Sequence, residues 1–163
     1  MKNKNMKICG VSYPLKQFDN NLLCYNINNK IPLFENSTLF NINLLNDNLK
    51  ENLKNIDNDY LKVKHLPTGC LIINRDIFQL LIDCNIIKSY KSDTGNNDII
   101  YNFFDCRIYN DKYLSEDYSF CQYIRDCNIN IYCLVNANIS HIGTFNYYGN
   151  LKENIKKFYL LNN

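Results

Sequence analysis

The segment Tyr113–Asp126, YLSEDYSFCQYIRD, places two carboxylates directly after a serine and ahead of an aromatic, apolar run. The apolar positions of this run recur at helical spacing, which predicts a helix over 115–127. Ser115 then stands where its hydroxyl can accept a hydrogen bond from the helix, and acids in a first turn suit the helix dipole. In the alternative interpretation, Glu116 or Asp117 faces a substrate as a general base.

The elements that position these acids follow from alternating apolar patterns. Strands of a mixed sheet and amphipathic helices succeed one another, which predicts one α/β domain over 1–163. Strands are expected at 8–12, 61–65, 70–73 and 129–135, and helices within 42–57, after Asn74 and from Leu151. Weak periodicity predicts a loop with a short hairpin over 19–40, and 91–103 is the most loop-like stretch.

Composition excludes several classes of protein. The net charge is +2 and no basic stripe carries aromatic residues, so nucleic acid is not an expected partner. Eight cysteines lack any C-x-x-C pair, and the chain opens with MKNKNMK in place of an apolar signal segment. We therefore expect reduced, mostly buried thiols and a cytoplasmic protein, with no membrane span.

Three segments, taken together in this order, resemble the acceptor-side half of GT-A glycosyltransferases of the family-2 type. They are LPTGCLIINRDIFQLL, then YNFFDCRIYNDKYLSEDYSFCQYIRDCNINIYCLV, then ISHIGTFNYYGN, and CGVSYPLKQFD is similar to the strand that follows the family's metal-binding Asp-x-Asp. The resemblance covers most of residues 7 to 149. It implies a partial GT-A-like mixed sheet with flanking helices.

The resemblance also implies an activity, the inverting transfer of sugar from a nucleotide sugar to an acceptor. Asp117 would be the base and Glu116 would support acceptor contact, whereas His141 would bind a divalent metal, Mn²⁺, or the diphosphate. Gly69, Asp105 and Tyr147 would contact substrate. Each has a structural alternative: acids commonly begin helices, His141 could be a hydrogen-bonded structural residue, Asp105 could brace its loop, and Tyr147 could simply pack. His65 lies in an alternating strand and is expected to be structural.

The nucleotide-binding half of the family has no counterpart, because only six residues precede Lys7. The string Asp57-Asn58-Asp59 spells Asp-x-Asp but follows an Asn-rich helical pattern, so we interpret it as a chance match. Without that half, 8–12 is expected to be an open strand edge that favours self-association or pairing with a complementary chain. Three interpretations stay open: an enzyme completed by a partner chain, an inactive relic that serves as a binding or interaction module, and an unrelated protein.

Overall fold

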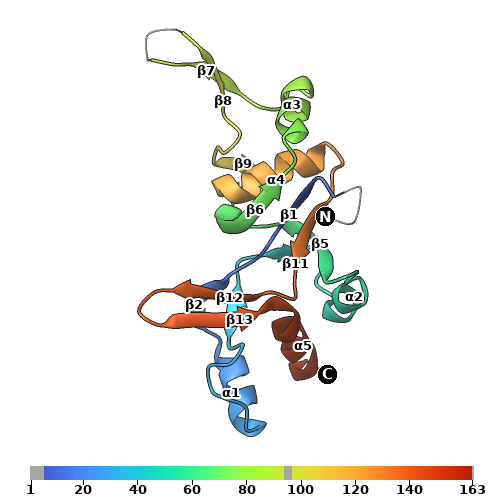
Figure 1. Cartoon of the computed structure of the whole chain (residues 1–163), viewed down its shortest axis with the longest axis vertical. Coiled ribbons are helices and arrows are strands. Elements are labelled where there is room, and N and C mark those ends of the chain that lie inside the picture. The colour runs from blue at the N-terminus through green and yellow to red at the C-terminus, as the bar shows by residue number, and fades with distance from the viewer. Residues whose placement is uncertain (1–5, 94–96, 163) are drawn as a thin grey trace.

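The computed structural model describes residues 6–93 and 97–162 and contains a five-stranded mixed sheet (Figure 1). The strand order is β4-β5-β11-β1-β6, in which β1 and β11 are parallel and the other neighbours are antiparallel. The strands are β1 (Ile8–Gly10), β4 (Asn43–Leu44), β5 (Tyr60–His65), β6 (Leu71–Ile73) and β11 (Ile131–Leu134). The predicted α/β class and all four predicted sheet strands are confirmed, with shorter bounds for three of them.

The expectation of an open edge at 8–12 is wrong. Cys9 of β1 pairs with Tyr132 of β11 on one side and with Ile72 of β6 on the other, so β1 is an interior strand. The sheet ends instead at β4 and β6. The short partner β6, entering from the turn η1 (Thr68–Cys70), covers the side that was expected to be open.

Helix α4 (Glu116–Asp126) packs on β5 and β11, and α3 (Asp76–Asp83) packs against α4. The alternation predicted for β5 is confirmed, since Leu61, Val63 and His65 are buried while Lys62 and Lys64 are exposed. Six consecutive residues of α4, from 119 to 124, are buried against the sheet and α3. This burial fixes the helix, and therefore fixes where its first turn points.

A second group of elements lies below the sheet in Figure 1 and contains two antiparallel strand pairs and three helices. The strand pairs are β2 (Pro14–Phe18) with β3 (Thr38–Phe40) and β12 (Asn138–Ile142) with β13 (Asn146–Asn150); the helices are α1 (Asn20–Asn28), α2 (Leu49–Lys54) and α5 (Leu151–Leu161). The final helix was predicted. The predicted helix within 42–57 is wrong in extent, because β4 occupies its start and Asn48 caps the shorter α2 at Glu51 N.

The loop predicted over 19–40 is wrong in its first half, which forms α1. Asp19 caps this helix by accepting a hydrogen bond from Leu22 N at 3.0 Å. The side chain of Asn26 is fully buried and donates to the carbonyl oxygens of Pro32 and Leu33. Buried amide contacts of this kind carry no apolar periodicity, which is why the helix escapes a search for amphipathic patterns.

Two further hairpins follow α3: β7 (Ser89–Lys91) with β8 (Ile99–Tyr101), and β9 (Arg107–Tyr109) with β10 (Lys112–Leu114). The first projects from the top of the molecule in Figure 1 and corrects the loop expected over 91–103, of which 94–96 fall outside the described residues. No helix among the described residues is long and apolar enough to cross a membrane.

Candidate functional site

The candidate site begins at the first turn of α4, where Glu116 and Asp117 follow Ser115. Ser115 occupies the N-cap position with an extended backbone, but its side chain makes no capping hydrogen bond, so the predicted cap is wrong in this respect. Instead, its backbone carbonyl accepts a hydrogen bond from Ser119 N at 2.7 Å. The first-turn N–H groups of α4, where Glu116 and Asp117 lie, therefore donate no hydrogen bond to the Ser115 hydroxyl.

Asp117 is half-buried and is held by a residue from another element. The hydroxyl of Thr68, in the turn η1, donates a short hydrogen bond to Asp117 Oδ1. The Oδ2 atom receives no hydrogen bond from the described residues. One carboxylate oxygen is thus fixed in position while the other keeps its capacity to accept a proton or a hydroxyl hydrogen bond, which is the arrangement that a positioned base requires.

Thr68 reaches Asp117 because of how the chain connects β5 to β6. The thiol of Cys121, inside α4, donates to the carbonyl of Leu66 and accepts from its N–H, each at 3.4 Å. The turn η1 then leads into β6, whose Leu71 pairs with Gly10 of β1. The segment before β6 consequently runs beside the segment that leaves β1, and Val11 N donates to Cys70 O at 3.1 Å.

Tyr13 lies on Gly69, directly beside Thr68. A Cβ atom at Gly69 would stand 3.0 Å from Cε1 of the Tyr13 ring, so a glycine at this position lets the ring lie against the backbone. The hydroxyl of Tyr13 accepts from Asn41 Nδ2 at 3.3 Å, and Asn41 Oδ1 accepts from Tyr118 OH at 2.7 Å. Gly69 therefore serves as a surface for Tyr13, a residue that the sequence analysis did not single out.

His141 lies on the other side of Tyr13, with the two ring centroids 4.9 Å apart and their planes at 65°. Its Nδ1 atom is 2.9 Å from the carbonyl oxygen of Pro14. A carbonyl can only accept, so Nδ1 carries a proton, and in the neutral ring Nε2 is the atom that can accept. The side chain can therefore accept a hydroxyl proton or a metal at Nε2.

Asp117 and His141 are thus connected through Thr68, Gly69 and Tyr13, and we call these five residues the Tyr13 row. The parallel pairing of β1 and β11 explains part of the arrangement, because the chains that leave both strands emerge at the same end of the sheet. Tyr13 follows β1 and His141 follows β11. Position after a strand end was the one signal in the sequence that could have identified Tyr13 and Thr68.

The other predicted site residues lie outside this row. Asp105 accepts from Ser119 Oγ at 3.0 Å and from Tyr123 OH at 3.0 and 3.1 Å, which braces the loop before β9. Glu116 is exposed, and its Oε2 atom lies 3.9 Å from Cys106 Sγ.

Tyr147 pairs across the β12–β13 hairpin with His141 but is buried. Its ring packs on Phe18 with the centroids 5.1 Å apart, so it supports the hairpin that carries His141.

Among residues 6–93 and 97–162, no group of three His, Cys, Asp or Glu side chains is arranged to hold a metal ion. His141 Nε2 alone offers one ligand, whereas stable protein sites for divalent cations use several. The residues of the described chain therefore do not fit the Mn²⁺ site that the resemblance implies, and the metal would need ligands from elsewhere.

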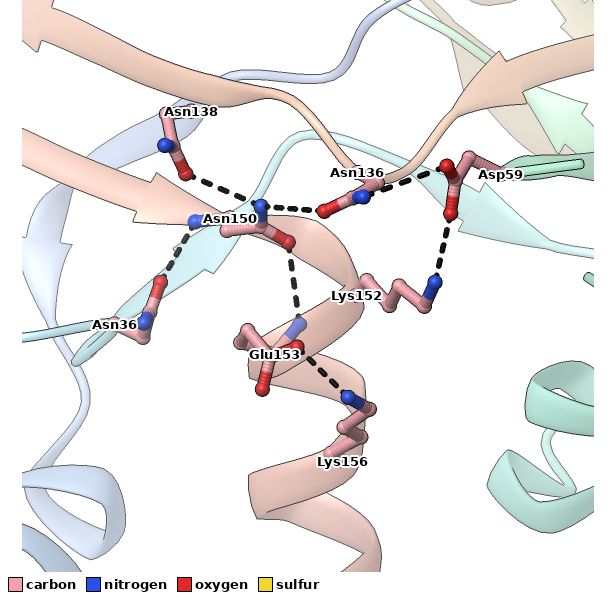
Figure 2. Close-up of polar contacts among 8 residues, drawn as sticks. All are labelled: Asn36, Asp59, Asn136, Asn138, Asn150, Lys152, Glu153 and Lys156. Carbon is pink, nitrogen blue, oxygen red and sulfur yellow. Dashed lines mark hydrogen bonds and ion pairs between the residues drawn. The ribbon is translucent and has the colours of Figure 1, made fainter.

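The Asp-x-Asp string is also engaged in structure. Lys152 Nζ donates to Asp59 Oδ1 at 2.7 Å, Asn136 Nδ2 lies 3.4 Å from Oδ2, and the hydrogen bond from Lys152 holds the pKa of Asp59 below its ordinary value. Figure 2 shows how this pair continues through Asn136 to Asn150 at the start of α5. The carboxylate of Asp59 ties α5 to the turn before β5, in agreement with a chance match.

His65 is a buried structural residue, as expected. Asn43 Nδ2 donates to its Nδ1 atom at 3.0 Å, so Nε2 carries the proton and donates to Gln122 Oε1 at 3.3 Å. The ring stacks on Tyr118, and burial lowers its pKa to about 4. The imidazole is therefore neutral at pH 7 and contributes no charge.

The chain matches no protein-family model, no curated protein and no solved structure.

Proposed function

We propose that the chain is the acceptor-side part of a GT-A-like glycosyltransferase of the family-2 type, whose nucleotide-binding half is supplied by a second polypeptide. The resemblance of the ordered segments motivates this proposal. The observation that carries it is the carboxylate of Asp117, which Thr68 fixes through Oδ1 and whose Oδ2 receives no hydrogen bond from the described residues, while the Tyr13 ring lies on Gly69, the residue after Thr68. An aromatic ring next to a fixed carboxylate suits a saccharide, which presents both C–H faces and hydroxyl groups.

In the proposed reaction, an acceptor hydroxyl lies against Tyr13 with its proton directed at Asp117 Oδ2. The hydroxyl oxygen attacks the anomeric carbon of the donor sugar and Asp117 takes the proton. The bond from the anomeric carbon to the diphosphate breaks, and its electron pair leaves with the diphosphate. His141 would accept a second hydroxyl hydrogen bond at Nε2, which orients the acceptor.

The donor's diphosphate has no carboxylate-and-metal site in the described chain, so we expect little or no transfer by this chain alone. Stabilisation of the leaving group by a metal normally supplies several kcal/mol, and a loss of about 4 kcal/mol corresponds to roughly a thousandfold in rate. A complementary chain that extends the sheet would have to pair at β4 or β6, since β1 is interior.

The first test of this proposal measures saccharide binding by saturation-transfer NMR with a panel of mono- and oligosaccharides. Tyr13→Ala and Asp117→Ala are expected to weaken binding several-fold, whereas Glu51→Gln, which changes an exposed acid in the first turn of α2, should leave it unchanged. Saccharides that bind all three variants equally, or that do not bind the unmodified chain, would contradict the proposal.

The second test separates an enzyme from the alternative, an inactive relic that serves as a binding module. The chain is assayed with nucleotide sugars, Mn²⁺ and a second polypeptide that carries an Asp-x-Asp half. Turnover that appears only with both polypeptides and disappears with Asp117→Asn supports the transferase. Saccharide binding without turnover under every combination supports the relic.

A further inference from the structure

A groove of about 900 Å³ opens between β4, the end of β5 and the β9–β10 hairpin, with α4 beneath it. The strand elements that form its walls are three separate segments of the chain, brought together by the packing of α4 on the sheet. Its volume is in the range of sites for small molecules. The groove does not include Asp117, Thr68, Gly69, Tyr13 or His141.

Three cationic side chains line this groove, Lys64 from β5, Lys112 from β10 and Arg125 from the last turn of α4. The acid in its lining is Asp47. None of the three cations forms an ion pair with an acid of the described chain, although Arg125 donates a hydrogen bond to Gln122 Oε1 at 3.3 Å.

The floor of the groove is rigid and uncharged. His65 and Tyr118 are stacked there with their ring centroids 4.9 Å apart. Both ring nitrogens of His65 are hydrogen-bonded, and Tyr118 OH is bonded to Asn41. Burial lowers the pKa of His65 to about 4 and raises the pKa of Tyr118 to about 12, so both are neutral at pH 7. The charge of the groove at that pH therefore comes from three cations and Asp47.

One wall presents an aromatic ring to solvent. Tyr113 of β10 is 67% exposed, which is high for a large apolar ring on a paired strand. Tyr109 pairs with Lys112 and Tyr113 pairs with Ile108, so the two tyrosine rings lie on opposite faces of the hairpin, and the Tyr109 hydroxyl donates to Asp126 Oδ1 at 3.2 Å. A planar ligand group has an exposed ring to stack on at Tyr113.

We propose that this groove binds a phosphate-bearing small molecule, with Lys64, Lys112 and Arg125 holding the phosphate. Three cations and one acid in the lining of a concave surface suit a compact anion, because each cation can add a charge-assisted hydrogen bond. The phosphate could belong to a sugar phosphate or to a nucleotide, and Tyr113 distinguishes the two, since only a nucleobase stacks on an aromatic ring over its full face. The groove stands independently of the Tyr13 row and of the proposed transfer reaction.

The test titrates the full chain with inorganic phosphate, a hexose 1-phosphate and uridine monophosphate, by calorimetry and by NMR at low salt. The double variant Lys64→Gln/Lys112→Gln is expected to weaken binding of an organic phosphate at least tenfold, and Arg125→Gln about tenfold, since a tenfold loss corresponds to about 1.4 kcal/mol, close to the value of one charge-assisted hydrogen bond. Lys62→Gln is the matched control, because Lys62 is two residues away on the same strand and lines a different cavity. That control should bind as the unmodified chain does.

The aromatic wall decides the source of the phosphate. If Tyr113→Ala weakens binding of uridine monophosphate and spares the hexose phosphate, the ligand is a nucleotide. If Tyr113→Ala binds each compound as the unmodified chain does, and the unmodified chain binds the hexose phosphate more tightly, the ligand is a sugar phosphate. The proposal is overturned if no compound binds at millimolar concentration, or if Lys62→Gln weakens binding as much as the groove variants do. Circular dichroism and thermal melts of each variant verify that the fold is retained.

Discussion

The hydroxyl of Thr68 donates a hydrogen bond to Asp117 from a position 49 residues earlier in the chain, and so joins the turn before β6 to the first turn of α4. The helix start alone does not orient Asp117, since Ser115 makes no side-chain cap. The orientation of the candidate base is therefore a property of tertiary structure. Without Thr68, the side chain would be free to change rotamer.

We expect Thr68→Val to reduce the free energy of unfolding by about 1–2 kcal/mol, because it removes a hydrogen bond to a charged group in a half-buried setting. Urea denaturation measures this loss. Thr68→Ser keeps the hydroxyl and is expected to lose less than half as much. Equal losses for valine and serine would show that packing of the threonine methyl, and not the hydrogen bond, is what matters there.

Gly10→Ala should be among the most destabilising single substitutions in the sheet. A Cβ atom at this position would lie 2.6 Å from the carbonyl oxygen of Cys70 and 2.9 Å from Leu71 Cδ1. The carbonyl belongs to the backbone that accepts from Val11 N, so it cannot move without breaking that bond. We expect a loss of about 3 kcal/mol on denaturation, at the upper end for overpacking.

Gly69→Ala is the matched control for Gly10→Ala. Its new Cβ would meet the Tyr13 ring at 3.0 Å, and that side chain is half-buried and can rotate. The expected loss is under about 1 kcal/mol, within the range of ordinary exposed substitutions. A loss at Gly69 as large as that at Gly10 would contradict the close approach assigned to β1 and β6.

The sheet was predictable because its strands bury alternate or continuous apolar side chains. Leu61, Val63 and His65 show the period of two in sequence and structure alike. The helix α4 was predictable for the corresponding reason, since its inward positions are apolar or aromatic. These signals depend on burial, which acts locally along each element.

Other features were not predictable, because asparagine side chains carry them. Asn26 is fully buried and bonds to three carbonyls between 32 and 35, and Asn36 Oδ1 accepts from Asn150 N at 2.6 Å (Figure 2). Asparagine is so frequent in this chain that its presence marks neither a turn nor a site. Likewise, the sequence predicts that Asp117 lies in the first turn of a helix. It does not predict the hydrogen bond from Thr68, which forms only because η1 lies beside the start of α4.

His65 should make the chain less stable in mild acid. Burial lowers its pKa to about 4, chiefly through desolvation, with Lys64 and Arg125 acting in the same direction. The unfolded chain binds a proton near pH 6.5 and the folded chain does not, so the contribution of His65 is complete above pH 6.5 and is lost as the pH falls to 4. We expect the free energy of unfolding to fall by about 2 kcal/mol. This is less than the full difference between the folded and unfolded pKa values would give, because solvent in the adjoining groove screens the charge.

Urea denaturation at pH 7 and at pH 4.5 measures this effect. The variant His65→Gln keeps hydrogen-bonding capacity without a titrating group and should show a smaller difference between the two pH values. The comparison takes the difference in unfolding free energy between the variant and the unmodified protein. The contribution of the carboxylates, which both proteins contain, cancels in this difference. Parallel pH profiles would mean that His65 accepts a proton in the folded state without cost.

Lys157 of α5 is buried and is expected to hold α1 in place. Its Nζ atom donates to Asn26 Oδ1 at 2.9 Å and to Glu35 O at 2.7 Å, and burial lowers its pKa. Lys157→Met preserves the length of the side chain but leaves both acceptors without this donor, at a cost of about 1–3 kcal/mol. Asn26→Leu should cost more, because it removes the donor to Ser37 Oγ and to several carbonyls in one step.

Hydrogen exchange locates the effect of these two variants. If α1 and α5 are joined through Lys157, both variants should accelerate exchange in α1 and in residues 29–37 while sparing β5 and β11. The exposed Lys156, which pairs with Glu153, provides the control, and Lys156→Met should leave exchange in α1 unchanged. Faster exchange spread evenly over the sheet would show that α1 unfolds only together with the whole chain.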